Sequence, residues 1–212
     1  ILDGISTRNV TAMSALFQST AFTGLDLSLL DVSNVTTFWA MFSNCTNLET
    51  LKLDWWNVRS ASLWWMFSST PALKNISMRG WKIWEEFNYW LCWWMSAGSS
   101  LEKINVTNWD LSDTRNLQSA FAGCSNLQNV VWLETWDTSG VNNMSSMFHN
   151  STSLISLDLS TFDTSFVTKM ENMFYNCWQL TSINLNNFKT NEVTNMQSMF
   201  HECRNLISLD LS

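Results

Sequence analysis

Four of the five cysteines recur at one position of a repeated pattern, which makes them the first candidates for redox or metal chemistry. Cysteine stands there at Cys45, Cys124, Cys177 and Cys203, and other copies of the pattern carry Thr20, Thr70, Gly98 and Ser151. A position shared by Cys, Thr and Ser is typical of a small buried site. The chain has no Cys-x-x-Cys pair, so structural zinc is not expected. Buried free thiols are therefore the favoured interpretation.

A disulfide is the alternative reading of these cysteines. An odd number of cysteines excludes a complete internal disulfide framework. Only Cys177 and Cys203 stand in adjacent copies, where the spacing makes a bond sterically conceivable. This alternative stays open at the level of the sequence.

The remaining polar side chains do not assemble a recognisable reaction centre. His149 and His201 share one position but lie two copies apart, too far for a catalytic dyad or a shared metal. Asp158 and Asp210 are also two steps apart, about 9.6 Å in a parallel ladder. No G-x-S-x-G, H-E-x-x-H or phosphate-binding glycine loop occurs. The sequence predicts no enzyme, no cofactor and no metal site.

Composition narrows the possible partners. The formal charge is −7, and only 14% of the residues are charged. A nucleic-acid partner needs a basic patch, and a polybasic membrane anchor needs the same. No apolar run reaches the 18 or more residues of a membrane-spanning helix. We therefore expect neither nucleic-acid binding nor direct membrane insertion.

An internal repeat positions all these residues. The pattern Phe-x-x-Cys-x-x-Leu-x-x-Leu-x-Leu is complete from Phe42 to Leu53, with close copies from Phe174 to Leu185 and from Phe200 to Leu211. Its first residue recurs at positions 17, 42, 67, 95, 121, 148, 174 and 200, a period of about 26. An extra residue intrudes near Trp132. A repeat of this length predicts a solenoid in which neighbouring units bury each other's apolar faces.

Each unit is expected to contain a short helix and a short strand. Apolar residues at i, i+3, i+6 and i+7, as in Val35, Phe38, Met41 and Phe42, form the stripe of two helical turns. Serines that precede these stripes, at Ser33, Ser139 and Ser165, could cap the helices. The later Leu-x-Leu segment alternates as a strand does. We predict an α/β leucine-rich-repeat solenoid of about eight units around one parallel sheet, forming a single domain over residues 1–212.

Both ends of the sequence lack the polar cap that terminal repeats normally carry. We expect the chain to be a piece of a longer protein. The alternative is that a second copy supplies the cap.

The repeat resembles a known family. The segments Leu157-Asp-Leu-Ser-Thr-Phe-Asp-Thr-Ser-Phe-Val-Thr-Lys-Met and Met173-Phe-Tyr-Asn-Cys are similar to the BspA-type leucine-rich repeat, also described as the mycoplasma lipoprotein or bacterial surface protein repeat. The resemblance is clear for residues 136–212 and weak for residues 78–100. It implies a curved solenoid on a cell surface, associated with adhesion to host proteins or other cells, and it supplies no catalytic residues.

Tryptophan departs from the repeat pattern, with 14 residues in the chain. Trp56, Trp81, Trp109 and Trp136 share a column with Leu30, Phe162 and Phe188, so we assign them to the core. A second set has no such explanation and comprises Trp39, Trp64, Trp65, Trp90 and Trp93. Later units place Gln118, Ser119, Ser145, Ser146, Glu171, Asn172, Gln197 and Ser198 at these positions, which we expect to face solvent. This set predicts an aromatic patch for a partner; the alternative is that residues 78–98 fold over it.

The expected sheet offers a second candidate surface. One exposed column contains Asp26, Lys52, Ser77, Asn105, Val131, Asp158, Asn184 and Asp210. Solenoids commonly bind partners on such a face. The leading hypothesis is an extracellular or cell-surface module that binds a protein or glycan ligand through the strand face, the Trp residues or both. The alternative is a spacer or self-associating element of a surface protein.

Overall fold

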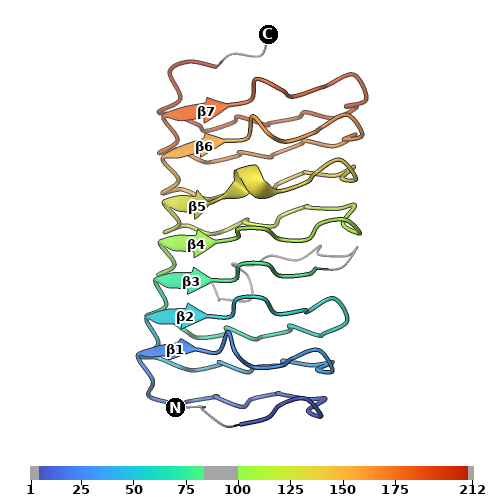
Figure 1. Ribbon diagram of the computed structural model, residues 1–212. Coiled ribbons are helices and arrows are strands. Elements are labelled where there is room, and N and C mark those ends of the chain that lie inside the picture. Colours follow the sequence, from blue (N-terminus) through green and yellow to red (C-terminus); the bar gives the residue numbers. More distant parts are fainter. Residues whose placement is uncertain (1–4, 84–99, 210–212) are drawn as a thin grey trace.

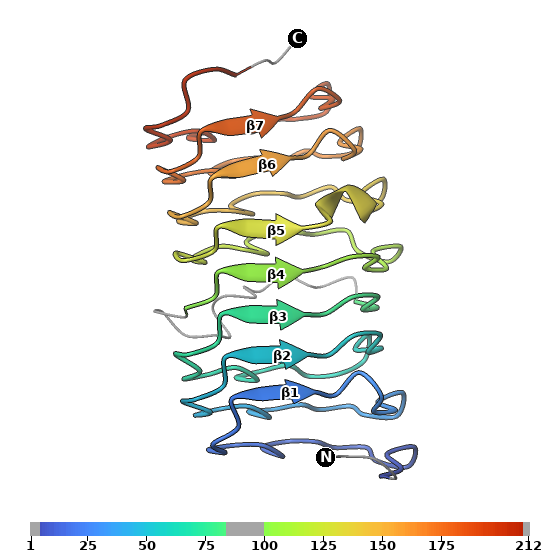
Figure 2. The same cartoon turned by 60° about the vertical axis from the view of Figure 1, so that its left-hand side comes forward.

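The protein is a stack of similar coils, each contributing one short strand. The computed structural model describes residues 5–83 and 100–209. Within these ranges the strands are β1 (Gly24–Asp26), β2 (Thr50–Lys52), β3 (Asn75–Ser77), β4 (Lys103–Asn105), β5 (Asn129–Val131), β6 (Ser156–Asp158) and β7 (Ser182–Asn184). Figures 1 and 2 show them side by side along one face of the stack, in chain order.

All strand pairs are parallel and in register. The central residues Leu25, Leu51 and Ile76 face one another, and the residues on either side of them form two further columns. A connection that runs once around the coil returns each strand to its neighbour, as parallel pairing requires. The predicted parallel sheet of a repeat solenoid is confirmed.

The expected number of eight units is not reached. The described residues hold seven strands, divided into a five-stranded sheet β1–β5 and a two-stranded sheet β6–β7. The eighth strand was expected around residue 209, where residues 208 and 209 have no strand assignment and Asp210 lies outside the described residues. The division between β5 and β6 falls where the extra residue was noted. Trp132 adopts a left-handed φ of 72° there and precedes the short 3-10 helix η1 (Leu133–Thr135).

The predicted helices are wrong. Each predicted helical segment is a chain of tight turns, and η1 is the one helix within the described residues. Ala40 and Asn44 have left-handed φ values of 53° and 60°, which interrupt any α-helix. Alternate amides bond back three residues, as Met41 N–H does to the carbonyl of Phe38. The amides between them bond to the next coil, as Phe42 N–H does to the carbonyl of Met66.

A three-residue turn period explains why the apolar spacing resembles that of a helix. Apolar residues at i, i+3 and i+6 face the same way in a chain of turns as they do in a helix. The serines assigned as helix caps belong to Asx turns instead, because the amide of Ser33 donates to Oδ1 of Asp31, and Ser165 uses Asp163 in the same way.

The core consists of stacked columns of identical or similar side chains. Phe17, Phe42 and Phe67 stack with ring centroids 5.6 and 5.7 Å apart. The second column runs Trp56, Trp81, Trp109, Trp136 and Phe162, with centroid separations between 5.4 and 6.4 Å. All four Trp rings of this column are buried, as predicted. Each indole N–H donates to a backbone carbonyl of the preceding coil, for example Trp136 to Val106.

Candidate functional site

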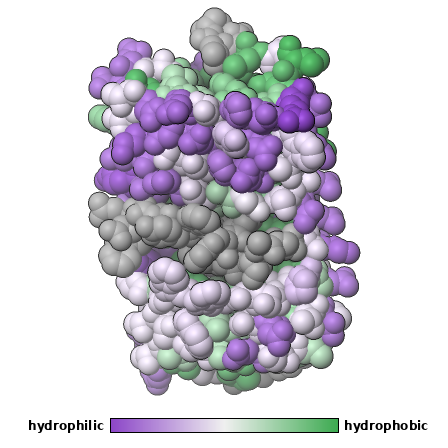
Figure 3. All heavy atoms as spheres, turned by 180° about the vertical axis from the view of Figure 1, so that it is seen from behind, coloured by the Kyte–Doolittle hydropathy of each residue, from purple (hydrophilic) through white to green (hydrophobic). Residues whose placement is uncertain are grey.

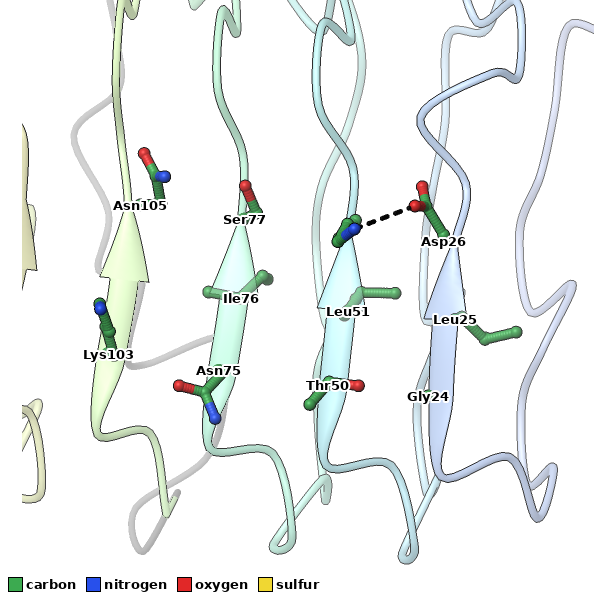
Figure 4. Close-up of a pocket in the computed structure, with 11 residues that line it drawn as sticks. Gly24, Leu25, Asp26, Thr50, Leu51, Asn75, Ile76, Ser77, Lys103 and Asn105 are labelled. Carbon is green, nitrogen blue, oxygen red and sulfur yellow. Dashed lines mark ion pairs between the residues drawn. The ribbon is translucent and has the colours of Figure 1, made fainter.

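The strand face carries a shallow depression over the first four strands. Its volume is about 540 Å³, and its lining comes from every strand from β1 to β4. Figure 4 shows Thr50, Asn75 and Lys103 toward the start of their strands and Asp26, Ser77 and Asn105 at the ends of their strands. The structure therefore brings together the predicted residues Asp26, Lys52 and Asn105. Asp158 and Asn184 lie side by side in the separate sheet β6–β7, and Asp210 lies outside the described residues.

Most acidic and amide side chains of this face already serve the backbone. One oxygen of Asp26 accepts from the amide of Ser28 at 3.1 Å, and Asn105 accepts from the amide of Thr107 at 3.0 Å. Asp158 and Asn184 close the same turn after β6 and β7. The hydrogen bonds from Ser28 and a contact with Lys52 lower the pKa of Asp26. These side chains shape the turns that end the strands, so only part of each remains available to a ligand.

Charges of both signs border the depression. Lys52 pairs with Asp26 at 3.3 Å, and both side chains are more than half exposed. The residues immediately before β2, β3 and β4 are Glu49, Lys74 and Glu102, all exposed. Alternating charge of this kind suits a ligand that itself carries both signs, as protein surfaces do.

An ion pair between a buried carboxylate and a half-exposed arginine stabilises the coil next to the depression. The side chain of Asp54 is 2% exposed and lies 2.7 Å from Nη2 of Arg79. It also accepts from the hydroxyl of Ser77 at 2.6 Å and from the amide of Arg79 at 3.0 Å. Burial alone would raise the pKa of Asp54, but the hydrogen bonds from Arg79 and Ser77 outweigh burial and hold the pKa below its usual value.

The Trp residues outside the core are half exposed where the structure describes them. The exposed fractions of Trp39, Trp64 and Trp65 are 49%, 51% and 52%. Trp90 and Trp93 lie outside the described residues. Of the later residues expected to face solvent in these columns, Ser119 and Ser145 are buried, which corrects that expectation. Their small side chains fit beneath the surface where an indole would not.

Other exposed aromatic residues were not anticipated. Trp55, Trp132 and Trp178 are all substantially exposed, and Trp55 lies over Gly80, where an added Cβ would come within 2.1 Å of its ring. In the repeat, Trp55 aligns with Gly80 and Asn108, and this alignment is the sequence feature that could have indicated an exposed turn position. Both of those residues have left-handed φ values.

Tyr175 lies between His149 and His201, with ring centroids 4.8 and 5.0 Å away. Burial lowers the pKa of His149.

The cysteine position is buried or half-buried, and it is not uniform in chemistry. Cys45, Cys177 and Cys203 are free, so the conceivable Cys177–Cys203 disulfide is absent, whereas Cys124 is disulfide-bonded. The thiol of Cys177 donates to the carbonyl of Phe148 at 3.1 Å. Burial, with a smaller contribution from Cys203, raises the pKa of Cys177 to about 12. At neutral pH this thiol is therefore protonated and a poor nucleophile.

Across residues 5–83 and 100–209, no group of three His, Cys, Asp or Glu side chains could hold a metal ion. The helical structure in the same ranges is too short to span a membrane.

Comparison with known proteins places the chain in a family. A family model described as Mycoplasma protein of unknown function, DUF285, matches residues 2–89 and 92–210. A search of curated proteins finds no match.

Two solved structures are similar in part. A leucine-rich repeat protein from Bacteroides ovatus is 17% identical with a TM-score of 0.42, over 92% of this chain and 63% of that one. This chain thus spans less than two thirds of that protein. A leucine-rich repeat protein from Eubacterium ventriosum is 12% identical with a TM-score of 0.32, over 92% of this chain and 68% of that one.

The family model covers nearly the entire sequence, and the coils repeat with the period of the BspA-type leucine-rich repeat. The chain belongs to the Mycoplasma protein family DUF285, a family of repeat proteins of the BspA type.

Proposed function

We propose that this protein is a cell-surface binding module that recognises another protein through the strand face of β1–β4. The observation that carries the proposal is the depression of about 540 Å³ that four successive strands line with both polar and apolar residues. A surface built from several coils presents more contact area than one coil can, and solenoids bind partners on such faces.

The charges around the depression indicate a protein ligand rather than a polyanion. Glu49, Lys74 and Glu102 alternate in sign along the edge of the strands, and Lys52 is paired with Asp26. Complementary charges of this kind steer association and select partners more than they add affinity. We accordingly expect binding to an extracellular matrix or cell-surface protein, with an association rate that falls as salt concentration rises.

Substitutions on β3 and β4 test this proposal. The purified chain is measured by surface plasmon resonance against a panel of immobilised extracellular-matrix proteins. We expect Asn75→Arg combined with Lys103→Glu to weaken binding at least tenfold, because both side chains line the depression. Lys169→Glu is the control, because Lys169 is exposed but lies away from the strand face. It belongs to the turn side, the face of the stack formed by the chains of tight turns, in a later coil.

Two results would count against the proposal. One is unchanged binding in the double variant. The other is a control variant that loses as much affinity as the double variant does.

A spacer or assembly element is the second candidate. It is favoured by the regular pairing between coils on the turn side, where parallel bridges join Asn116, Asn143, Lys169 and Asn195 in succession. Regular stacks of this kind can also associate with copies of themselves. Light scattering over a range of protein concentrations distinguishes the two roles, because a persistent monomer excludes self-assembly. Labelling of intact cells with a membrane-impermeant reagent tests the proposed surface location.

A further inference from the structure

Three of the half-exposed Trp residues, Trp39, Trp64 and Trp65, lie on neighbouring coils on the turn side of the stack. Thr37 and Ser62 form a parallel bridge, and Trp39 and Trp64 each follow two residues later. The amide of Ala40 bonds to the carbonyl of Trp64 at 3.0 Å, which keeps the two coils in register. Trp39 and Trp64 are therefore about 4.8 Å apart along the stack, and Trp65 is adjacent. These three residues are called the Trp surface below.

The scaffold does not need tryptophan at these positions. Other coils place Ser14, Gln118 and Gln197 in the column of Trp39 and Trp64, and Ser146 and Ser198 in the column of Trp65. Every described member of the Trp65 column has a left-handed φ, which is 60° at Trp65 itself. This conformation costs a bulky residue about 1–2 kcal/mol. The left-handed conformation belongs to the scaffold, and Trp65 is the bulkiest described residue that occupies it in this column.

The coils that carry the Trp surface are also free of charge on their turn side. Residues 9–25, 32–48 and 60–73 contain no Asp, Glu, Lys, Arg or His, and their polar side chains are Ser, Thr, Asn and Gln. Charged residues return on the turn side of later coils, at Lys169, Glu171, Glu202 and Arg204. Figure 3, which views the stack from behind, shows a related contrast in hydropathy: much of the surface over the C-terminal coils is strongly hydrophilic, and most of the surface over the N-terminal coils has intermediate hydropathy.

This combination matches the chemistry of a neutral carbohydrate. A sugar ring presents an apolar C–H face that packs on an indole ring, and its hydroxyls pair with Ser, Thr and Asn side chains. A charged glycan or a protein would bring ionic groups that lose water at this surface and find no opposite charge. A column that repeats from coil to coil is best matched by a ligand whose own units repeat.

We propose that the Trp surface is a second binding site, separate from the strand face, and that its ligand is an uncharged linear polysaccharide. Sugar units stack on Trp39, Trp64 and Trp65 along the direction of the coils.

Affinity electrophoresis tests the proposal with the full 212-residue chain. Native gels contain one of four neutral polysaccharides (laminarin, mannan, xylan or dextran) or one of two anionic ones (heparin or polygalacturonate). We expect retardation in at least one neutral gel and none in the anionic gels. The triple variant Trp39→Gln, Trp64→Gln and Trp65→Ser should bind that polysaccharide at least tenfold more weakly. Each replacement copies the residue that a later coil uses, so the fold is preserved.

Two control variants separate this site from its neighbours. Trp55→Asn removes another exposed Trp and introduces the residue that stands at Asn108 with the same left-handed backbone. Asn75→Arg with Lys103→Glu disables the strand face. Both controls should retain full polysaccharide binding, so failure of this proposal and failure of the strand-face proposal are distinguishable.

Three results would overturn the proposal. In the first, no neutral polysaccharide changes the migration of the wild-type chain. In the second, a polysaccharide retards the triple variant as much as the wild type. In the third, the triple variant is the only variant that no longer binds a purified matrix protein. The last result would make the Trp surface a protein interface instead.

Discussion

Individual polar residues in this protein mainly stabilise turns and the joints between coils. Asp54 shows the point most clearly, because its buried carboxylate connects two successive coils through Ser77 and Arg79. Side chains also stabilise the backbone in the Asx turns after the strands, where a side-chain oxygen accepts from the amide two residues later. Acidic residues that look like candidates for ligand binding are thus partly occupied by the fold.

Replacement of Asp54 measures the contribution of this joint. We expect Asp54→Ala to lower the free energy of unfolding by about 1–3 kcal/mol at pH 7, because the Ser77 hydroxyl and the Arg79 amide lose their acceptor. Chemical denaturation followed by fluorescence provides the measurement. Lys52→Ala, which breaks an exposed pair, is the control and should cost less. Equal losses in the two variants would contradict this assignment.

The effect of Asp54 should also depend on pH in a defined direction. The pKa of Asp54 is lowered in the folded protein, so the folded state favours the ionised carboxylate. Its stabilisation is present above the unfolded pKa of about 4 and is lost as the pH falls through the lowered folded pKa. The difference in stability between the wild type and Asp54→Ala should therefore shrink below about pH 4. A difference that grows on acidification would contradict the contacts described.

At the scale of the element, the repeated unit is a strand and a chain of turns rather than a strand and a helix. Left-handed residues recur twice in each turn segment, four residues apart, as at Ala40 and Asn44. Ser, Asn and Gly fill many of these positions, and Asn and Gly tolerate positive φ well. Each turn segment shares half of its hydrogen bonds with the next coil, so it is stable only within the stack.

The Trp column provides a test of how coils are joined. Trp136 stacks on Trp109 and Phe162, and its indole N–H bonds to the carbonyl of Val106 at 3.0 Å. We expect Trp136→Phe to cost about 1–2 kcal/mol, because Phe occupies this column at Phe162 but cannot donate to Val106. Trp136→Ala should cost about 3–5 kcal/mol through the cavity it leaves.

Urea denaturation of the two Trp136 variants gives both values. Similar losses for Phe and Ala would show that the hydrogen bond, and not the stacked ring, dominates. That outcome would contradict the picture of a core held together by ring packing.

At the scale of the whole molecule, the stack is continuous although its sheet is not. The strands separate between β5 and β6, where Trp132 adds a residue, yet the turn-side bridge from Asn116 to Asn143 and the stacking of Trp136 on Phe162 cross the same boundary. We propose that the chain behaves as a single domain, because a shared core and shared turn hydrogen bonds couple the two sheets.

A comparison of two probes tests this coupling. Thirteen of the 14 Trp residues lie at or before position 136, so Trp fluorescence reports mainly on the N-terminal coils. Amide hydrogen exchange of β6 and β7, followed by mass spectrometry, reports on the C-terminal coils. In increasing urea we expect both probes to give the same midpoint. Separate midpoints would show that the break between β5 and β6 divides the molecule into two units.

The sequence alone determined the repeat, the parallel register of the strands and the inner columns. The repeat period and the spacing of the apolar residues can be read directly from the sequence. Only one alignment of the coils buries Leu51, Phe42 and Trp56 together. The columns of the strand face followed directly from that alignment, including the adjacency of Asp26 and Lys52.

Tertiary structure decided the rest, because the deciding interactions join different coils. A three-residue apolar spacing fits a helix and a chain of turns equally well, and the hydrogen bonds between neighbouring coils selected the turns. The exposure of Trp39 and the burial of Ser145 likewise depend on what the adjacent coils place beside each residue. Such contacts link residues about one period apart, beyond the reach of any local pattern.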